Sequence, residues 1–396
     1  MQEDPIVIVG AARTPMGGFQ GSLTPLSAPE LGGYAIQGAV ERAGVAPKDV
    51  QDLIMGLCLF AGVKQAPARQ AAHLAGIPWD AGATTISKMC GSAMKATMLA
   101  HDNILAGSHD IMVAGGMESM TNAPYILPKA RGGYRLGNGD TVRDHMFMDG
   151  LEDAYDEGRL MGTFAEDTAE HYQFTREAQD NYAIESLTRA KKAVEDGSFD
   201  DEVVPVTVKT RKGETMVTSD EQPFNANIEK IPQLKPAFRK DGTVTPANSS
   251  SISDGAAALV LMKRSEAEKR GLTPKALIHA HSTHSQEPNW FTTAPIGAVK
   301  KVLEKTGWSK EEVDLFEVNE AFAVVAMAAM RDLDIPHDKI NVHGGACALG
   351  HPVGASGARI VVTLMSALEK YGLKKGVASL CIGGGEATAV SIERLN

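Results

Sequence analysis

Several features that would assign a protein class at once are missing from this chain of 396 residues. No apolar run reaches the roughly 18 residues that a bilayer-spanning helix needs, so we expect no membrane association. The net charge of −10 argues against a nucleic-acid partner, although local charge and not the total steers an anionic ligand. The acidic start (Met1–Asp4) leads straight into an apolar segment, so we expect no targeting peptide and a cytoplasmic location.

Cysteine is scarce, and common motifs for metals and nucleotides are absent. The four cysteines have no secretory context, so we expect reduced thiols and not disulfides. No two of them have CxxC spacing, and we expect no metal site. The turn at residues 10–13 does not match the G-x-G-x-x-G pattern, which argues against a dinucleotide-dependent dehydrogenase.

The chain does contain a regular alternation of short apolar segments and amphipathic segments. Strand-like runs lie at residues 6–9, 53–59, 84–89, 111–114, 256–262, 276–281, 315–318 and 377–380, with helix-like runs at 30–43, 66–74, 91–105, 296–305 and 320–333. This α/β pattern predicts parallel βαβ units, and we interpret the two ends of the chain as repeats of one unit. From about 121 to 246 the pattern weakens, which predicts an insertion outside the sheet with a helix from Thr175 to Glu195.

Glycine, with 40 residues, is concentrated in turns that carry a histidine or a cysteine. His351 lies in the glycine-rich segment 341–357, and Cys90 and Cys381 lie in small-residue turns at strand or helix ends. Asn319 follows another predicted strand. Loops at such positions converge on the ligand crevice of a parallel α/β sheet, so one shared site explains the four placements better than four accidents.

Cys90 is a candidate nucleophile because residues 91–93 should form the first turn of a helix. Unpaired backbone N–H groups there favour a thiolate and can also bind an oxyanion. The alternative is a small apolar residue at a tight strand-helix junction. Alternatives stay open for the other turns too: Asn319 as a helix N-cap, His351 as a loop histidine bonded to backbone, and the glycines at 383–385 as a phosphate cradle.

Four ordered blocks resemble the thiolase family over nearly the whole chain. They are Lys-Met-Cys-Gly-Ser-Ala-Met-Lys-Ala (88–96), Val-Asn-Glu-Ala-Phe-Ala (318–323), Gly-Gly-Ala-Cys-Ala-Leu-Gly-His-Pro-Val-Gly-Ala-Ser-Gly (344–357) and Cys-Ile-Gly-Gly-Gly (381–385). The nearest resemblance is to acetyl-CoA acetyltransferases and related 3-ketoacyl-CoA thiolases. It implies duplicated βαβαβαββ halves in a layered αβαβα core: residues 1–120 with 247–270, and residues 271–396, with a loop domain inserted at 121–246.

The resemblance also implies a role for each polar group of the site. Cys90 would become acylated, His351 would deprotonate it, and Cys381 would remove the α-proton of acetyl-CoA. Asn319 would hold a water that completes one oxyanion hole with His351, and the N–H groups of Cys90 and Gly383 would form the other. The substrates implied are CoA thioesters and free CoA, with no further cofactor.

The inserted domain would carry coenzyme A. Ser250 matches the serine that meets the pantetheine arm, and Phe238 and Phe322 match apolar contacts. Leu151, Leu160 and Met161 fall in the segment expected to face the acyl-CoA.

Some positions depart from the family pattern. Leu160 stands where short-chain biosynthetic members tend to have a histidine, and Phe224 stands about where an arginine often faces coenzyme A. Glu386 follows the three glycines where an uncharged residue is common, and His343 replaces a usual asparagine. We therefore expect the acyl-chain preference and the coenzyme contacts to be affected.

The reaction we expect is the reversible Claisen condensation of two acetyl-CoA to acetoacetyl-CoA and CoA, through an acyl-cysteine. The alternative is a 3-ketoacyl-CoA thiolase of fatty-acid β-oxidation that acts on longer chains. A ketoacyl-carrier-protein synthase lacks the Cys381 motif, and a non-catalytic CoA-binding relative would normally have lost one of the four polar groups. From the resemblance we expect a homodimer or homotetramer, with the glycine-rich segment 131–139 at tetramer contacts.

Overall fold

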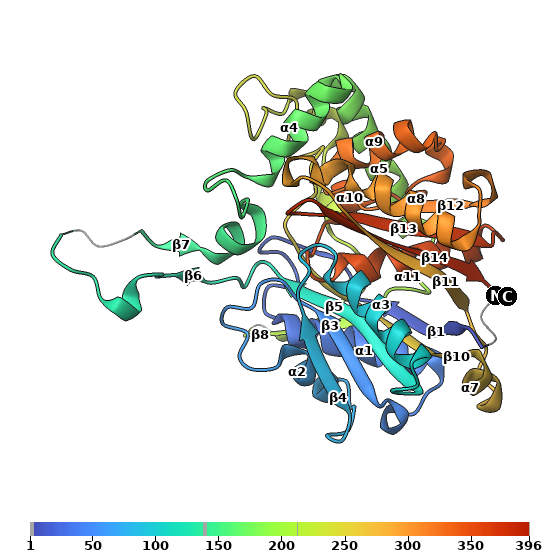
Figure 1. The fold of residues 1–396 in the computed structure, drawn as a ribbon. Coiled ribbons are helices and arrows are strands. Elements are labelled where there is room, and N and C mark those ends of the chain that lie inside the picture. The colour runs from blue at the N-terminus through green and yellow to red at the C-terminus, as the bar shows by residue number, and fades with distance from the viewer. Residues whose placement is uncertain (1–3, 138–140, 212, 396) are drawn as a thin grey trace.

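The computed structural model describes residues 4–137, 141–211 and 213–395, and its centre is one mixed sheet (Figure 1). The strand order is β12-β13-β14-β11-β1-β10-β5-β3-β4, with β2 paired to β10 beside it. The bounds are β1 (Ile6–Arg13), β2 (Gly17–Gly18), β3 (Asp52–Gly56), β4 (Gly82–Ile86), β5 (Ile111–Ser119), β10 (Ser253–Lys263), β11 (Ala276–Ser285), β12 (Leu315–Val318), β13 (Lys375–Ile382) and β14 (Glu386–Arg394).

The sheet consists of two halves that repeat one strand order. From the centre outward the first half runs β1-β10-β5-β3-β4 and the second half runs β11-β14-β13-β12. The central strands β1 and β11 pair antiparallel through Val7 with Leu277 and Ile8 with Ala276. The place that β4 holds in the first half is taken in the second by a single parallel bridge between Phe316 and Ile340. The expected duplication of an α/β unit is confirmed.

Helices cover both faces of each half and fill the space between the halves. Their bounds are α1 (Ala28–Ala43), α2 (Pro67–Leu74), α3 (Ser92–Leu105), α4 (Met161–Tyr172), α5 (Arg176–Glu195), α6 (Gln222–Asn225), α7 (Arg264–Lys269), α8 (Ala294–Thr306), α9 (Ala323–Leu333), α10 (Ala346–Leu349) and α11 (Ser356–Lys370). α3 and α11 contact each other and strands of both halves, whereas α1 packs on the first half and α8 on the second (Figure 1). These are the αβαβα layers that the resemblance implies.

Small residues let the central layer of helices approach both halves of the sheet closely. α3 buries Ala93, Ala96 and Ala100, and they share one apolar cluster with residues of α11, β10 and β14. At Gly116 of β5, an added Cβ would lie 2.0 Å from the carbonyl oxygen of Gly354, the loop residue shortly before α11. No larger side chain fits there, so the glycine is required by the packing.

Single 3-10 or π turns join several elements. They cover Pro47–Asp49, Ala130–Gly132, Phe147–Leu151, Ile228–Gln233, Pro288–Thr293, Lys310–Glu312 and His337–Lys339. A capping box precedes one of these turns: the Glu312 carboxylate accepts from the Ser309 backbone N–H at 2.8 Å.

The long connection between β5 and β10 lies outside the central sheet, as predicted. Its strands pair only with each other: β6 (Tyr125–Ile126) with β7 (Arg143–Asp144), and β8 (Val206–Thr210) with β9 (Gly213–Val217). The predicted helix at 175–195 is confirmed as α5, and Thr175 caps it by accepting from the Ala178 N–H at 3.1 Å.

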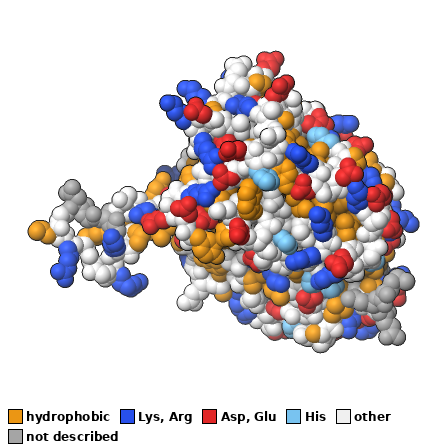
Figure 2. Space-filling model, turned by 45° about the horizontal axis from the view of Figure 1, so that its top comes forward, with side chains coloured by type: hydrophobic (Ala, Val, Ile, Leu, Met, Phe, Trp, Pro, Cys, Tyr) orange, Lys and Arg blue, Asp and Glu red, His pale blue; other side chains and the backbone are white. Residues whose placement is uncertain are grey.

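The β6–β7 part of this connection projects from the body as an arm that carries apolar and basic side chains (Figures 1 and 2). Exposed apolar residues on it are Tyr125, Leu127, Tyr134, Leu136 and Val142. Within the described residues no helix has the length and apolar character that crossing a membrane requires.

Candidate active site

Cys90 lies in a strained turn between β4 and α3. The predicted strand at 84–89 ends at Ile86, because the Lys88 N–H donates to the Ser92 hydroxyl at 2.8 Å instead of to another strand. That hydroxyl in turn donates to the Met89 carbonyl at 2.6 Å. Met89 has a φ of +47°, a left-handed conformation that is uncommon outside glycine. The turn therefore holds Cys90 immediately before the first residues of the helix.

The helix start favours a thiolate at Cys90, but burial of the side chain opposes it. Burial raises the pKa of the thiol to about 11, and the backbone N–H groups of Gly383 and of Cys90 itself offset only part of that. Desolvation of the anion outweighs the helix start here. Cys90 is thus a thiol at neutral pH and needs a base before it can act as a nucleophile.

His351 presents one free ring nitrogen to the interior. The Ser356 hydroxyl donates to the Pro352 carbonyl at 3.0 Å, so it must accept from the His351 Nδ1–H, 2.5 Å away. The proton is therefore assigned to Nδ1. Nε2 is buried and has no partner within the described part of the chain. Burial lowers the pKa of His351 to about 3, so the ring is neutral and Nε2 can accept a proton.

Asn319 directly follows β12, and its amide is not a helix cap. The predicted helix from Glu320 begins only at Ala323, with Phe322 as the N-cap, so that alternative for Asn319 is excluded. The side chain is 1% exposed. Its Oδ1 lies 3.5 Å from Nη2 of the buried Arg359, while Nδ2 has no partner among the described residues. Arg359, which sequence reasoning missed, thus orients the amide with its donor free.

Cys381 is fully buried one residue before the end of β13. The predicted strand at 377–380 runs on to Ile382, because β13 and β14 stay paired up to Ile382 and Glu386. Gly384 and Gly385 close this hairpin with φ of +95° and +94°, which explains the glycines structurally and leaves no reason for a phosphate cradle. Burial, followed by the neighbouring Cys90, raises the pKa of the Cys381 thiol well above its usual value.

The Cys90 and Cys381 loops touch each other. A Cβ added to Gly91 would lie 2.3 Å from Cδ1 of Ile382, the residue after Cys381. The Gly383 N–H faces the Cys90 sulfur. Lys88 and Glu386 form an ion pair of 2.5 Å between the same two loops, which accounts for the unusual charge after the glycines.

Glu118, on β5, bonds to the loop that follows β3 and to the loop that carries His351. Sequence reasoning did not single out this residue. Its buried carboxylate accepts from the N–H groups of Cys58 (2.9 Å), Leu59 (3.2 Å) and Gly354 (2.9 Å). These bonds end β3 at Gly56, short of the predicted residue 59. Burial raises the pKa of Glu118 to about 7 despite the three donors. Its partner Gly354 lies in the His351 loop, so Glu118 fixes that loop against the first half.

Most of the residues predicted to contact substrate form one apolar wall. Phe238 and Phe322 meet edge to face with centroids 6.1 Å apart, and Gly162 leaves the space that the Phe238 ring fills. Met161 packs in the same cluster, and its sulfur lies 3.2 Å from where a Cβ on Gly383 would be. Ser250 donates its backbone N–H to the Ala321 carbonyl at 2.9 Å, which places it beside Phe322.

Two of the remaining residues that the sequence singled out lie near the apolar wall or Cys90, and one is exposed. Leu151 packs against the cluster that holds Cys58 and Val353, to which Cys90 also packs. Leu160 directly precedes Met161, and a bridge from Leu160 to Glu152 brings it near Leu151. Phe224 is 48% exposed on α6.

The arrangement combines the parts of acyl transfer with those of proton abstraction. The Cys90 thiol and the His351 ring nitrogen, which has no partner among the described residues, could serve as a nucleophile and its base, and a second buried thiol lies in the adjoining Cys381 loop. The Asn319 Nδ2 group, which has no partner among the described residues, and the Gly383 N–H beside the Cys90 sulfur are donors that could bind oxygen atoms that become negative. Of the described residues, those grouped closely enough to hold a metal ion are His101, Asp102 and His281, outside this site.

Comparisons with known proteins agree over the full length of the chain. Residues 6–265 match the family model of the thiolase N-terminal domain, and residues 272–394 match that of the thiolase C-terminal domain. The acetyl-CoA acetyltransferase of Cupriavidus necator is 47% identical and covers 98% of this chain and 99% of its own. The cytosolic acetyl-CoA acetyltransferase of Mus musculus is 48% identical over 99% of this chain and 98% of its own.

Solved structures agree with the sequence relatives. The Bacillus anthracis acetyl-CoA acetyltransferase superposes with a TM-score of 0.96 at 43% identity, covering 99% of both chains. A thiolase from Ascaris suum, solved in complex with coenzyme A, gives a TM-score of 0.93 at 42% identity and covers 99% of this chain and 100% of its own. With both family models and the whole fold in agreement, this chain belongs to the thiolase family.

Proposed function

We propose that this protein is an acetyl-CoA C-acetyltransferase, which converts two acetyl-CoA reversibly to acetoacetyl-CoA and free CoA. The proposal rests on the Cys90 sulfur, which the Gly383 N–H faces, and on two buried groups that have no partner among the described residues, Asn319 Nδ2 and His351 Nε2. Arg359 contacts Asn319 and acts electrostatically on His351, and Val353 of the His351 loop shares an apolar cluster with Cys90. Relatives named acetyl-CoA acetyltransferase at 47–48% identity support the choice of substrate.

The first half of the reaction is acyl transfer to Cys90. His351 Nε2 takes the thiol proton, Cys90 Sγ attacks the thioester carbonyl, and the proton then goes to the departing CoA sulfur. A base is required because the Cys90 thiol, with a pKa of about 11, is not ionised at neutral pH. The backbone N–H groups of Cys90 and Gly383 stabilise the oxygen anion, with each donor contributing on the order of 3 kcal/mol.

The second half forms the carbon–carbon bond. With Cys90 acylated, Cys381 passes its thiol proton to His351 Nε2, and the resulting thiolate removes the α-proton of a second acetyl-CoA. The enolate carbon attacks the acyl carbonyl carbon, the bond from that carbon to Cys90 Sγ breaks, and the Cys90 thiolate takes the proton back from His351. The raised pKa of Cys381 suits this step, because a thiolate with a high pKa is a stronger base toward a weak carbon acid. Asn319, through a water, and His351 stabilise the enolate oxygen. No cofactor beyond the CoA thioesters takes part.

The longer-chain 3-ketoacyl-CoA thiolase remains the second candidate because of Leu160. This residue adds an apolar side chain beside Met161 where short-chain members of the family tend to have histidine. The wall of Met161, Phe238 and Phe322 is apolar as well.

A chain-length profile separates the two candidates. Thiolysis by free CoA is measured for acetoacetyl-CoA and for 3-ketoacyl-CoA with eight or more carbons. A kcat/KM highest for acetoacetyl-CoA supports the acetyltransferase, and a preference for longer chains replaces it with the degradative enzyme. Cys90→Ala should lower both rates on the order of 10⁴-fold or more, and unchanged thiolysis in this variant would refute either assignment.

The ligand and the location follow from the same proposal. Coenzyme A binds along Ser250, Phe238 and Phe322, with Leu151, Leu160 and Met161 near the acyl group. The Ascaris suum thiolase in complex with coenzyme A supports a CoA ligand. The cytosolic designation of the mouse relative supports a cytoplasmic location.

We also propose a homodimer or homotetramer and the division of the chain into three parts. β4 is an edge strand whose residues are all exposed or half-buried, which suits pairing with a second copy. The arm exposes five large apolar side chains that a further contact would bury. Of the predicted contact segment 131–139, residues 138 and 139 lie outside the described residues. The three parts are 1–120 with 247–270, 121–246, and 271–396.

A further inference from the structure

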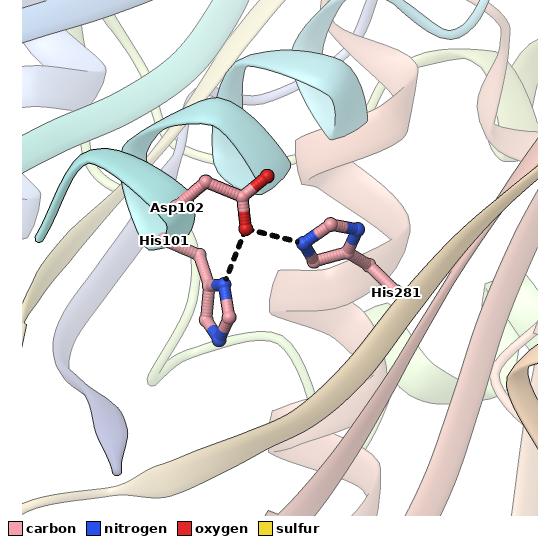
Figure 3. Close-up of side chains that lie close together, drawn as sticks. All are labelled: His101, Asp102 and His281. Atoms are coloured by element: carbon pink, nitrogen blue, oxygen red, sulfur yellow. Dashed lines mark hydrogen bonds and ion pairs between the residues drawn. The ribbon is translucent and has the colours of Figure 1, made fainter. Parts of the chain in front are cut away.

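Two histidines and an aspartate meet at the end of α3 opposite to Cys90 (Figure 3). His101 and Asp102 lie in the C-terminal half of the helix, and His281 lies on β11. One oxygen of Asp102, Oδ1, is 3.0 Å from His101 Nδ1 and 2.8 Å from His281 Nε2. The three ligand atoms all lie within 4.8 Å of one another. Residues 179 apart in the sequence thus converge on one point.

The cluster has a buried inner part and an open outer part. His101 is 4% exposed, and its second nitrogen, Nε2, has no partner in the described part of the chain. The Asp102 side chain is 50% exposed, and that of His281 is 16% exposed. Water can reach the outer side to occupy further coordination positions.

The donor set matches borderline first-row metal ions. Two imidazole nitrogens and a carboxylate suit Zn²⁺ and its neighbours, whereas Mg²⁺ and Ca²⁺ prefer oxygen ligands alone. Nitrogen ligands about 2.0–2.1 Å from a tetrahedral zinc lie roughly 3.3 Å apart. To admit the ion, Asp102 Oδ1 would move slightly away from each ring, and the two ring nitrogens, now within 4.8 Å of each other, would approach. Unpaired carbonyls at the C-terminal end of α3 add negative potential that favours a cation.

We propose that His101 Nδ1, Asp102 Oδ1 and His281 Nε2 bind one divalent first-row ion, for which Zn²⁺ is the best match. The ion clamps the helix that begins after Cys90 to the central strand of the other half. The site uses no cysteine and no CxxC spacing, which is why the sequence predicted no metal. It is separate from the catalytic residues, so the proposal does not depend on the proposed reaction.

A purely structural role is the competing explanation. Without an ion, Asp102 accepts N–H donors from both rings, and this alone links α3 to β11. In that case Asp102→Asn retains an oxygen acceptor and most of the link. A metal site behaves differently, because the amide loses the charge and the affinity that coordination needs.

Titration of the purified full-length protein with Co²⁺ and Zn²⁺ tests the proposal. Co²⁺ reports its own ligands by visible absorption, because thiolate ligation at the cysteines adds a sulfur-to-metal charge-transfer band. Affinity and the thermal midpoint Tm are measured for the wild type, Asp102→Asn and His281→Ala. His109→Ala is the matched control, since His109 also lies beside an aspartate, Asp52, at 3.5 Å. Mg²⁺ serves as the negative control, because we expect it not to bind at this site.

We expect one equivalent of Co²⁺ without a thiolate band, and a rise in Tm with Zn²⁺ but not with Mg²⁺. Both variants at the site should bind at least roughly tenfold more weakly, while His109→Ala binds normally. Far-UV circular dichroism shows whether each variant is folded. If His281→Ala does not fold, the binding measured for Asp102→Asn decides the test. Absence of binding, binding with a thiolate band only, or equal binding in Asp102→Asn overturns the metal site.

Discussion

The two halves of the molecule use the same scaffold for different chemistry. The turn before α3 presents Cys90 in the first half, and the turn before the matching helix α11 presents His351 in the second. The hairpin that follows each helix has also diverged. Between β5 and β10 it has expanded into the arm, α4, α5 and the β8–β9 hairpin, whereas between β13 and β14 three glycines close it beside Cys381. The duplication places turns at equivalent positions in the two halves, and the residues in each turn decide which chemistry it can carry out.

Burial has opposite effects on the two matching groups. It raises the pKa of the Cys90 thiol to about 11 and lowers that of His351 to about 3. Both are therefore neutral at rest, and no preformed ion pair exists between them at neutral pH. In the proposed mechanism, transfer of the thiol proton to the ring becomes favourable when a bound thioester carbonyl takes up the developing charge, which would couple activation of the nucleophile to the presence of substrate.

The strongest way to separate the two thiols is Cys381→Ala. This change should lower condensation and thiolysis on the order of 10⁴-fold while Cys90 still accepts an acetyl group, because only the carbon–carbon step needs the second thiol. Mass spectrometry of the intact protein after incubation with acetyl-CoA measures the acetyl adduct. Cys347→Ala, at a thiol outside the site, is the control and should retain both steps. Loss of the adduct in Cys381→Ala would contradict separate roles.

Asn319→Ala tests the donor that follows β12. Removing one donor from an oxyanion hole should lower kcat by about 10²- to 10³-fold with little change in KM, because the bond strengthens only as charge develops. Steady-state kinetics of acetoacetyl-CoA thiolysis measure the effect. A rise in KM at unchanged kcat would instead assign Asn319 to ground-state binding.

Ser356→Ala tests how α11 positions the ring of His351. The change leaves the buried His351 Nδ1–H without an acceptor, which costs about 1–3 kcal/mol and removes the bond that selects the tautomer. We expect kcat to fall about tenfold, and Ser356→Thr, which keeps a hydroxyl, to restore most of it. Equal activity of the alanine and threonine variants would show that the hydroxyl does not act through the ring.

Glu386→Gln tests the ion pair between the two cysteine loops. Because Lys88 and Glu386 are 20% and 32% exposed, we expect at most about 1 kcal/mol of stability from the pair and a small change in activity. Urea unfolding of the wild type, Glu386→Gln, Lys88→Gln and the double variant gives the coupling energy. A coupling energy near zero would mean that loop packing alone holds the two turns together.

Much of this architecture could be predicted from local sequence. The alternation of apolar and amphipathic runs predicted most of the strands and helices of both halves, although not β14, and Thr175 marked the start of α5 correctly. The errors occurred where backbone groups bond to distant side chains. Glu118 ends β3 early, Ser92 ends β4 early, and α9 starts three residues later than predicted, at Ala323. A pattern of hydrophobicity contains no information on such bonds.

In the candidate site, too, local sequence predicted some residues, and contacts between distant segments decided others. Cys90, Asn319, His351 and Cys381 could be selected from glycine-rich turns and ordered motifs. Arg359 and Ser356 could not, because nothing in their own segments shows that one faces Asn319 and the other selects the tautomer of His351. The charge of Glu386 was noticed as unusual, but its partner Lys88 is 298 residues away.

The sequence by itself determined which segments form strands and helices, the duplication, and the residue types available for thioester chemistry, because these depend on neighbours along the chain. Only the tertiary structure decided the protonation states. A pKa depends on how completely the fold removes a group from water and on which distant groups it places beside it. For that reason Cys90 is a thiol and not the thiolate that its position before a helix suggested.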